Sequence, residues 1–184
     1  PGPHTNVVLL GVGGTTNLLL AVGNAGKTLI SRACETNMVV TNIVGTETIV
    51  TNVTFNTLGL IWEELAGLTT KTLQGVAANA DRYVLTGDEG AILTSVNGSN
   101  WTTLQPVTAK FLSGVTAHPS GWVAVGEQGA LLTAGPNATA WSAVPPLTAS
   151  WLNKVRWVGG HLVAVGQNGA ILTSANGSDW IQRD

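Results

Sequence analysis

The chain has 184 residues, of which 44% are hydrophobic and only 10% are charged, and its formal net charge is −2. This length suits one domain with a sizeable core, and the small negative charge excludes a broad basic surface for nucleic acid or anionic lipid. The apolar runs are much shorter than the ~20 residues of a membrane helix, so no membrane-spanning segment is expected.

Cys34 is the single cysteine, which excludes an internal disulfide and a cluster of thiolate metal ligands. The sequence starts at Pro1 rather than Met, which indicates a processed chain. Low charge combined with abundant Thr, Asn, Gly and Ser is typical of exported proteins, so we expect an extracellular or periplasmic location.

Residues 9–31 read LLGVGGTTNLLLAVGNAGKTLIS, which is a series of short apolar segments bounded by turns with Gly and Asn, and Leu10, Gly11 and Val12 match the L-x-G-V start of the later units. Short alternating or β-branched segments between such turns are typical of strands. The phrase AVGNAGKTLIS in this segment returns as AVGQNGAILTS at 164–174. One four-stranded unit is therefore expected to begin here.

Residues 32–66 depart from this phrase. Polar and β-branched residues alternate here, and Gly23 lies 64 residues before Gly87, although the later repeats are about 40 residues long. We expect a contracted, degenerate unit at about 41–66. A pentapeptide-repeat β-helix is the alternative, because threonine recurs every five residues, at Thr36, Thr41, Thr46 and Thr51.

Three regular units follow, at 73–105, 112–144 and 152–184. The first consists of four short apolar segments, LQGVAA, RYVLTG, AILTS and WTTLQ, and the other two repeat it. Gly87, Gly126 and Gly166 recur at spacings of 39 and 40 residues, a period that propeller blades show.

The sequence therefore predicts an all-β fold, a β-propeller of four-stranded antiparallel blades. We expect four to five blades, one of them degenerate near residues 32–66. The whole chain, 1–184, is expected to form one propeller domain in which 1–72 holds divergent blades and 73–184 holds regular ones.

The turns GDEG, GEQG and GQNG place two polar residues between glycines, which is typical of tight hairpins with positive φ. Their polar residues should lie at equivalent hairpin tips on one rim, either as solvated turn residues or as a polar ligand site. These residues are Asp88, Glu89, Glu127, Gln128, Gln167 and Asn168, and the three acidic ones are candidates for ligand or partner contact.

Two of the units end in S-x-N-G-S-x-W, and the unit between them keeps Asn137, Thr139 and Trp141 but lacks the glycine. The motif residues are Ser95, Asn97, Gly98 and Trp101 in one unit, and Ser174, Asn176, Gly177 and Trp180 in another. This motif resembles the Asp-box of bacterial neuraminidase repeats. More broadly, residues 73–184 are similar to sialidase-type and photosystem II stability/assembly factor-type propellers.

The resemblance implies a propeller fold and leaves the activity open. By resemblance to the assembly factors, the chain would dock a protein partner. Those factors use a basic patch, and this sequence, with eight Lys and Arg, is not expected to supply one.

The seven tryptophans fall into two sets. Trp101, Trp141 and Trp180 recur with the repeat and are predicted to pack between blades, with sugar stacking as the alternative, and Trp62 lies 39 residues before Trp101, as a preceding blade requires. Phe111 and Trp151 each directly precede the first strand of a unit, where they would either pack between blades or face a ligand, and the less regular Trp122 and Trp157 are candidates for contact with a partner.

The sequence does not favour an enzyme. Sialidases use an arginine cluster, a Tyr–Glu pair and an acidic residue, whereas Arg82 and Arg156 lie in strands of different units here. Glu63 and Glu64 are adjacent, so their side chains should point apart. The histidines, His4, His118 and His161, are dispersed, and neither a metal nor a cofactor is expected.

We therefore expect a non-enzymatic recognition or assembly module that binds a protein partner. The alternative is an extracellular self-associating structural subunit, of a filament or surface-layer type, or a glycan-binding lectin. A glycoside hydrolase is the least favoured class. A homo-oligomer is expected, because a short wheel with one irregular blade leaves an apolar face for a second copy or another protein to cover.

Overall fold

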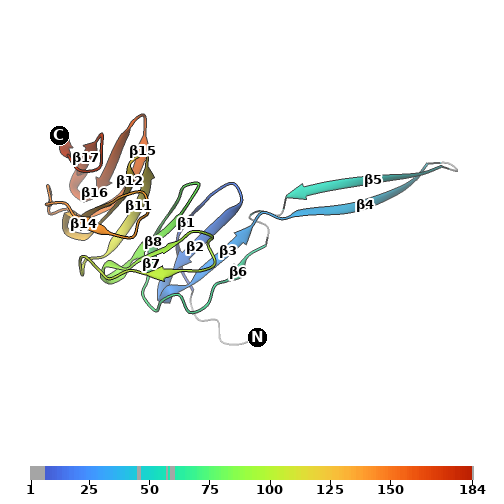
Figure 1. The fold of residues 1–184 in the computed structure, drawn as a ribbon, viewed down its shortest axis with the longest axis horizontal. Coiled ribbons are helices and arrows are strands. Elements are labelled where there is room, and N and C mark those ends of the chain that lie inside the picture. Colours follow the sequence, from blue (N-terminus) through green and yellow to red (C-terminus); the bar gives the residue numbers. More distant parts are fainter. Residues whose placement is uncertain (1–6, 45–46, 57, 59–60, 184) are drawn as a thin grey trace.

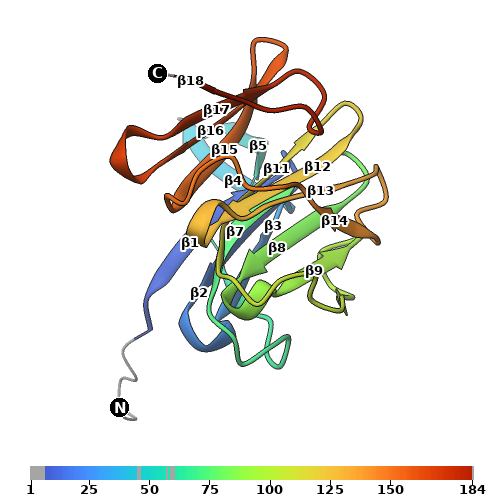
Figure 2. The same ribbon diagram turned by 90° about the vertical axis from the view of Figure 1, so that its left-hand side faces the viewer.

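The computed structural model of the chain describes residues 7–44, 47–56, 58 and 61–183, with residues 35–44 and 47–56 described by their backbone alone. His4 and Thr46 lie outside the described residues. Four sheets of four antiparallel strands follow one another along an arc, and a two-stranded ribbon extends from one end of it (Figures 1 and 2). Among the described residues, none of the helical turns has the length and apolar character needed to cross a membrane.

Each sheet is a meander in which strands that are consecutive within the sheet pair antiparallel. We call the sheets blades 1 to 4. Blade 1 contains β1 (Leu9–Gly14), β2 (Leu18–Gly23), β3 (Thr28–Arg32) and β6 (Glu63–Glu64), and blade 2 contains β7 (Leu73–Ala78), β8 (Tyr83–Gly87), β9 (Ile92–Ser95) and β10 (Thr102–Thr103). Blade 3 contains β11 (Leu112–His118), β12 (Gly121–Gly126), β13 (Leu131–Ala134) and β14 (Trp141–Ala143), and blade 4 contains β15 (Leu152–Val158), β16 (His161–Gly166), β17 (Ile171–Ser174) and β18 (Ile181–Arg183).

The predicted all-β propeller is confirmed, and the described residues form four blades. The segment near 32–66 is not a separate degenerate blade. Its two long strands, β4 (Glu35–Val44) and β5 (Glu47–Asn56), pair with each other over ten residue pairs and form the ribbon. β6 then returns to pair with β3 and completes blade 1. An antiparallel hairpin, rather than a pentapeptide β-helix, therefore accounts for the polar and β-branched alternation.

The core consists of three apolar layers, one between each pair of neighbouring blades. Successive residues of a strand point to opposite faces, so each strand of a central blade supplies two layers. On β12, for example, Trp122 packs toward blade 2 while Val123 packs toward blade 4. No blade can bury both of its faces with its own residues, because a sheet face needs another layer against it.

Equivalent turns join the second and third strands of every blade. Glu89, Gln128 and Asn168 have φ of 50°, 51° and 56°, and the glycine after each is also in the left-handed region. The predicted hairpin geometry of GDEG, GEQG and GQNG is thus confirmed. Each turn forms a short 3-10 segment: η1 (Asn24–Gly26), η2 (Asp88–Gly90), η3 (Glu127–Gly129) and η4 (Gln167–Gly169).

In the interior of the arc, these turns also link a blade to the loop that enters the next one. The amide of Gly90 donates to the carbonyl of Lys110, and that of Gly129 donates to the carbonyl of Ser150, over 2.9 and 2.8 Å. A Cβ added at Gly129 would lie 1.9 Å from the carbonyl oxygen of Thr148. Around Gly169, at the end of the arc, no atom lies within 4 Å of that position among the described residues. The same turn therefore has a neighbour in the interior and none at blade 4.

Gly129→Ala and Gly169→Ala form a matched pair that tests this contact. Both substitutions place alanine at a φ of about +70°, which costs about 1 kcal/mol of unfolding free energy. Gly129→Ala should cost about 1–3 kcal/mol more, because its methyl group meets the entry loop of blade 4. Urea unfolding measures both values, and equal losses would contradict the proposed role of the turn.

Candidate functional site

The turn between the third and fourth strands is closed by short hydrogen bonds. In blade 2, Ser95 Oγ accepts from the amide of Gly98 at 2.9 Å, and Asn97 Oδ1 accepts from the amides of Ser99 and Asn100 at 2.9 Å each. Trp101 Nε1 donates to the carbonyl of Gly98 at 3.0 Å. Local side-chain bonds of this kind fix a turn without help from the rest of the fold. We call this arrangement the clasp.

Blade 4 repeats the clasp, and blade 3 keeps part of it. In blade 4, Gly177 donates to Ser174 Oγ at 2.8 Å, and Trp180 Nε1 donates to the carbonyl of Gly177 at 2.9 Å. In blade 3, Ala138 stands in the glycine position with φ of 49°, and Trp141 Nε1 donates to its carbonyl at 3.1 Å. The indole therefore keeps its orientation in all three regular blades.

The clasp tryptophans point toward the preceding blade, as predicted for packing between blades. Trp141 and Trp180 are each only 8% exposed and belong to the apolar layers on either side of blade 3. Trp62 directly precedes β6, which gives it the same place in blade 1. No described blade precedes blade 1, and Trp62 is 37% exposed.

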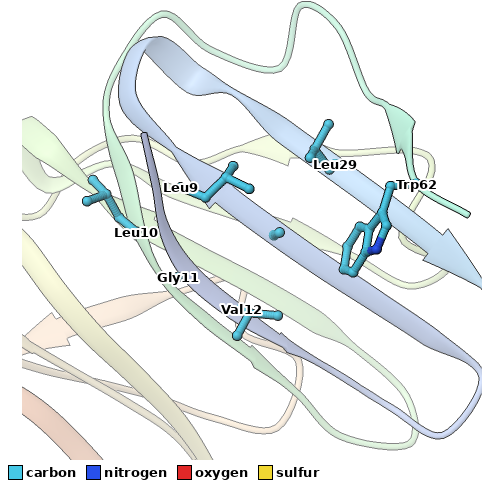
Figure 3. Close-up of a pocket in the computed structure, with 7 residues that line it drawn as sticks. Leu9, Leu10, Gly11, Val12, Leu29 and Trp62 are labelled. Carbon is cyan, nitrogen blue, oxygen red and sulfur yellow. The ribbon is translucent and has the colours of Figure 1, made fainter. Parts of the chain in front are cut away.

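This outward face of blade 1 forms an apolar groove of about 500 Å³ (Figure 3). β1, β2 and β3 supply its floor, and Trp62 closes one side. Val12 is 63% exposed in the groove, whereas Val115, the residue at the same register in blade 3, is 3% exposed. The lining residues are Leu9, Leu10, Gly11, Val12, Ala21, Leu29 and Trp62. Blade 1 thus presents a surface of core composition to solvent.

The opposite end of the arc has a different chemistry. Lys154 and Arg156 on β15 pair with Val165 and Val163, and Arg183 on β18 pairs with Ile171, so the three basic residues share the outward face of blade 4. All three are exposed. We call this surface the basic face. The sequence analysis predicted that the chain would lack a basic patch. The basic face was missed because its three residues are far apart in the sequence.

One predicted contact residue is buried. Trp122 is fully buried in the layer between blades 2 and 3, and its Nε1 donates to the carbonyl of Pro136 at 3.0 Å. The prediction that it contacts a partner is therefore wrong, because an interior side chain has no surface to offer. Trp157 is half-buried, and its ring centroid lies 5.8 Å from that of His118.

The other predicted contact residues lie at blade entrances and turn tips. Phe111 and Trp151 are half-buried and their ring centroids are 5.7 Å apart, so the structure brings these two together. Glu127 Oε2 accepts from the amide of Phe111 at 3.3 Å. Glu89 pairs with Lys71 at 3.0 Å, and Asp88 Oδ1 accepts from the amide of Glu89 at 2.8 Å. Contact with a ligand at these residues remains a prediction.

The arginines are not gathered at one place suited to a substrate carboxylate. Arg82 donates to Thr94 within blade 2, Arg32 donates to Ser99, and Arg183 donates to Thr173 within blade 4. In the described part of the chain, no three His, Cys, Asp or Glu side chains lie close enough together to hold a metal ion.

His118 is a half-buried titratable group at the boundary of blades 3 and 4, and its Nε2 atom is inaccessible to solvent. Its Nε2 has no hydrogen-bond partner among the described residues, and a Cβ added at Gly177 would lie 3.0 Å from that atom. Burial lowers the pKa of His118 below its ordinary value of 6.5, because the charged imidazolium would lose its hydration. Burial therefore disfavours the charged form of this imidazole, which lies against the blade 4 clasp.

No known protein-family model matches the chain, and no curated protein matches it either. Solved structures do match. YCF48 bound to a D1 peptide has a TM-score of 0.67 at 15% identity, with 97% of this chain aligned to 56% of that one. YCF48 from Cyanidioschyzon merolae has a TM-score of 0.64 at 21% identity, over 100% of this chain and 57% of that one.

The glutaminyl cyclase of Myxococcus xanthus is similar at a TM-score of 0.53 and 13% identity, over 92% of this chain and 66% of that chain. These likenesses show the propeller fold. The present chain spans little more than half the length of the two YCF48 chains.

The partial burial of His118 predicts that acid lowers the stability of the fold. Below pH 6.5 the histidine of the unfolded chain takes up a proton before the folded one does, so the unfolding free energy should fall as the pH drops from 6.5 through the lower native pKa. His118→Gln removes this titration, and its melting temperature should decline less than that of the wild type between pH 7.5 and about pH 5. Parallel curves for the two proteins would show that His118 does not couple folding to pH.

Proposed function

We propose that this chain is a non-enzymatic protein-binding module, in which the groove of blade 1 accepts an apolar segment of a partner protein. The exposed core-like face of blade 1 is the observation that carries this proposal. The valines at the register of Val12 in the other blades are at most 6% exposed, and Trp141 and Trp180, at the position of Trp62, are 8% exposed. Large exposed apolar patches on a folded protein are characteristic of surfaces that bind other proteins.

The shape of the groove suits a peptide segment better than a small molecule. It is an open hollow on the face of a sheet rather than an enclosed cavity, and its lining is apolar apart from backbone groups (Figure 3). The polar side chains near it include the ion pair of Lys27 with Glu64, on the β3–β6 side of the blade. An apolar anchor on the partner, placed against Trp62, would be buried there in the way that interface hot spots are.

The structural likenesses support a binding role of this class. One similar propeller, YCF48, has been solved with a D1 peptide bound. Another similar propeller is a glutaminyl cyclase, so the fold alone does not decide between binding and catalysis. The separate engagement of Arg32, Arg82 and Arg183 with serine and threonine side chains favours binding over sialidase-type chemistry.

Peptides selected from a random library on the purified protein test the groove. We expect the selected sequences to be rich in aromatic and aliphatic residues. Trp62→Ser and Val12→Ser should each weaken binding by roughly tenfold or more, about 1.4 kcal/mol, because each removes part of the apolar lining. Isothermal titration calorimetry measures the affinities.

Val158→Ser provides the matched control, because Val158 is an equally exposed valine on the outward face of blade 4. This variant should bind the selected peptides as the wild type does. The proposal fails if the peptides bind Trp62→Ser and Val12→Ser with unchanged affinity, or if Val158→Ser is the variant that loses them.

A further inference from the structure

The outer edges of the four blades are short. Their outermost strands, β6, β10, β14 and β18, have two or three residues each. A strand at the edge of a sheet exposes backbone N–H and C=O groups with which another chain can pair, and a short edge strand limits this pairing. The blades are therefore poor places for the addition of a further strand at their outer edges.

The β4–β5 ribbon, in contrast, has two long edges. Each of its strands has ten residues, and neither strand pairs with any other strand among the described residues. The ten residue pairs follow one another without a shift of register, so no β-bulge interrupts this ladder. An isolated two-stranded hairpin is at best marginally stable in water, whereas a sheet of three or more strands is more stable. The backbone of the ribbon therefore offers a place for further strands and would be stabilised by them.

The sequence of the two strands lacks the residues that protect sheet edges from pairing. Residues 36–44 and 48–56 contain no Lys, Arg, Asp, Glu, Pro or Gly. Natural sheets protect their edges with charged residues, with proline and with bulges. The edges of the ribbon are both long and unprotected, which is typical of strands that pair with another chain.

The register defines which backbone groups face the open edges. Val44 and Glu47 are paired and are separated by two residues, so they form a hydrogen-bonded pair. Hydrogen-bonded and non-hydrogen-bonded pairs alternate along an antiparallel ladder, which makes Thr41 and Val50 a non-hydrogen-bonded pair. The N–H and C=O groups of Val50, and of every second residue along β5, therefore face the open edge of β5. Those of Thr41 face the open edge of β4.

The edge of β5 is better suited than that of β4 to pair with an identical edge. Two copies of β5 can align antiparallel about a two-fold axis at Asn52, so that residues 48–56 of each copy pair and their outward backbone groups meet. None of these nine positions is charged, and seven of them are Thr, Val, Ile or Phe, which favour strands. The equivalent alignment of β4 covers residues 35–43, which include Glu35 and only five residues of these types.

We propose that two copies of the chain associate through the edges of β5 and form a four-stranded antiparallel sheet. A second copy is the partner, because it supplies an edge of the same length that is likewise uncharged and unprotected. The ribbon extends from blade 1 away from the rest of the arc, so the antiparallel alignment places the two arcs at opposite ends of the new sheet (Figure 1). The inference goes beyond the proposed function and uses no residue of the groove of blade 1.

Backbone hydrogen bonds along nine residues set the strength of this contact. Every second residue contributes its N–H and C=O groups, so the two edges share up to about ten hydrogen bonds over roughly 30 Å. Each bond adds little net stability, because water bonds to the same groups in the separate chains. We therefore expect a weak dimer. Since the contact uses the same edge of both copies, it closes the assembly at two chains.

Analytical ultracentrifugation of the wild type and two proline variants tests the pairing. The wild type should rise from the mass of one chain to that of two between about 1 and 100 µM. Val50→Pro removes a backbone donor from the proposed edge and should weaken the dimer by at least about tenfold. Thr41→Pro is the matched control, since it makes the same change at the directly opposite residue, on the edge of β4. It should dimerise as the wild type does.

Hydrogen exchange of single amides reports on the edge directly. In the concentrated wild type, the amides of Val50, Asn52 and Thr54 should exchange at least about tenfold more slowly than in the dilute protein, because the second copy bonds to them. The amide of Thr41 should exchange equally fast in both samples. If both proline variants lose the dimer, this comparison still identifies the edge that pairs.

The inference is overturned if the wild type keeps the mass of one chain up to about 100 µM, or if Val50→Pro dimerises normally. It is also overturned if concentration protects the amide of Thr41 instead of that of Val50. Trp62→Ser should dimerise as the wild type does, and loss of the dimer in this variant would contradict the inference, since the groove would then be the contact. Because Val50→Pro keeps every groove residue, its peptide binding tests the proposed function separately.

Discussion

Packing of one apolar sheet face against the next is the interaction on which this molecule depends. Neighbouring residues on a single strand, such as Trp122 and Val123, are buried in different layers, so a central blade requires a partner on each side. Interior blades find both partners within the chain. The blades at the two ends of the arc find only one among the described residues, and the outward face of each end blade has no described blade against it. The exposed character of these two faces therefore follows from the arrangement of the blades as well as from individual residues.

The two end faces meet this condition in opposite ways. Blade 1 keeps the residues of an interior face, including Trp62 at the position where Trp141 and Trp180 are buried. In blade 4, Lys154 and Arg156 stand at the positions where the first strands of the other blades carry small residues. Water solvates these two charged side chains well. An apolar end tolerates many apolar partners, whereas a charged end selects by the sign of the charge it meets. The two end faces of the described arc thus differ in chemistry, one being apolar and the other basic.

Much of the fold could be predicted from the sequence because its signals are local. The turn at Glu89 and the clasp around Ser95 and Asn97 are each formed by a few consecutive residues, so residues 73–184 reveal their blades directly. The ribbon could not be separated from a blade, since its strands have the same alternation and differ only in their pairing partners. Trp62 marked the return from the ribbon to blade 1, because it lies 39 residues before Trp101, at the spacing of the clasp tryptophans. Trp122 was misplaced because its burial depends on the blade opposite, and the basic face appears only when β15 and β18 lie in one sheet.

The ribbon occupies the place that the clasp turn holds in the other blades, between Ser31 of the third strand and Trp62 before the fourth. Blade 1 nevertheless keeps its four strands and its register, so the intervening segment is structurally independent of the sheet that bears it. This corner of a blade is consequently a natural grafting point, where a foreign epitope or a whole small domain can be displayed at the periphery while the layers beneath it stay intact.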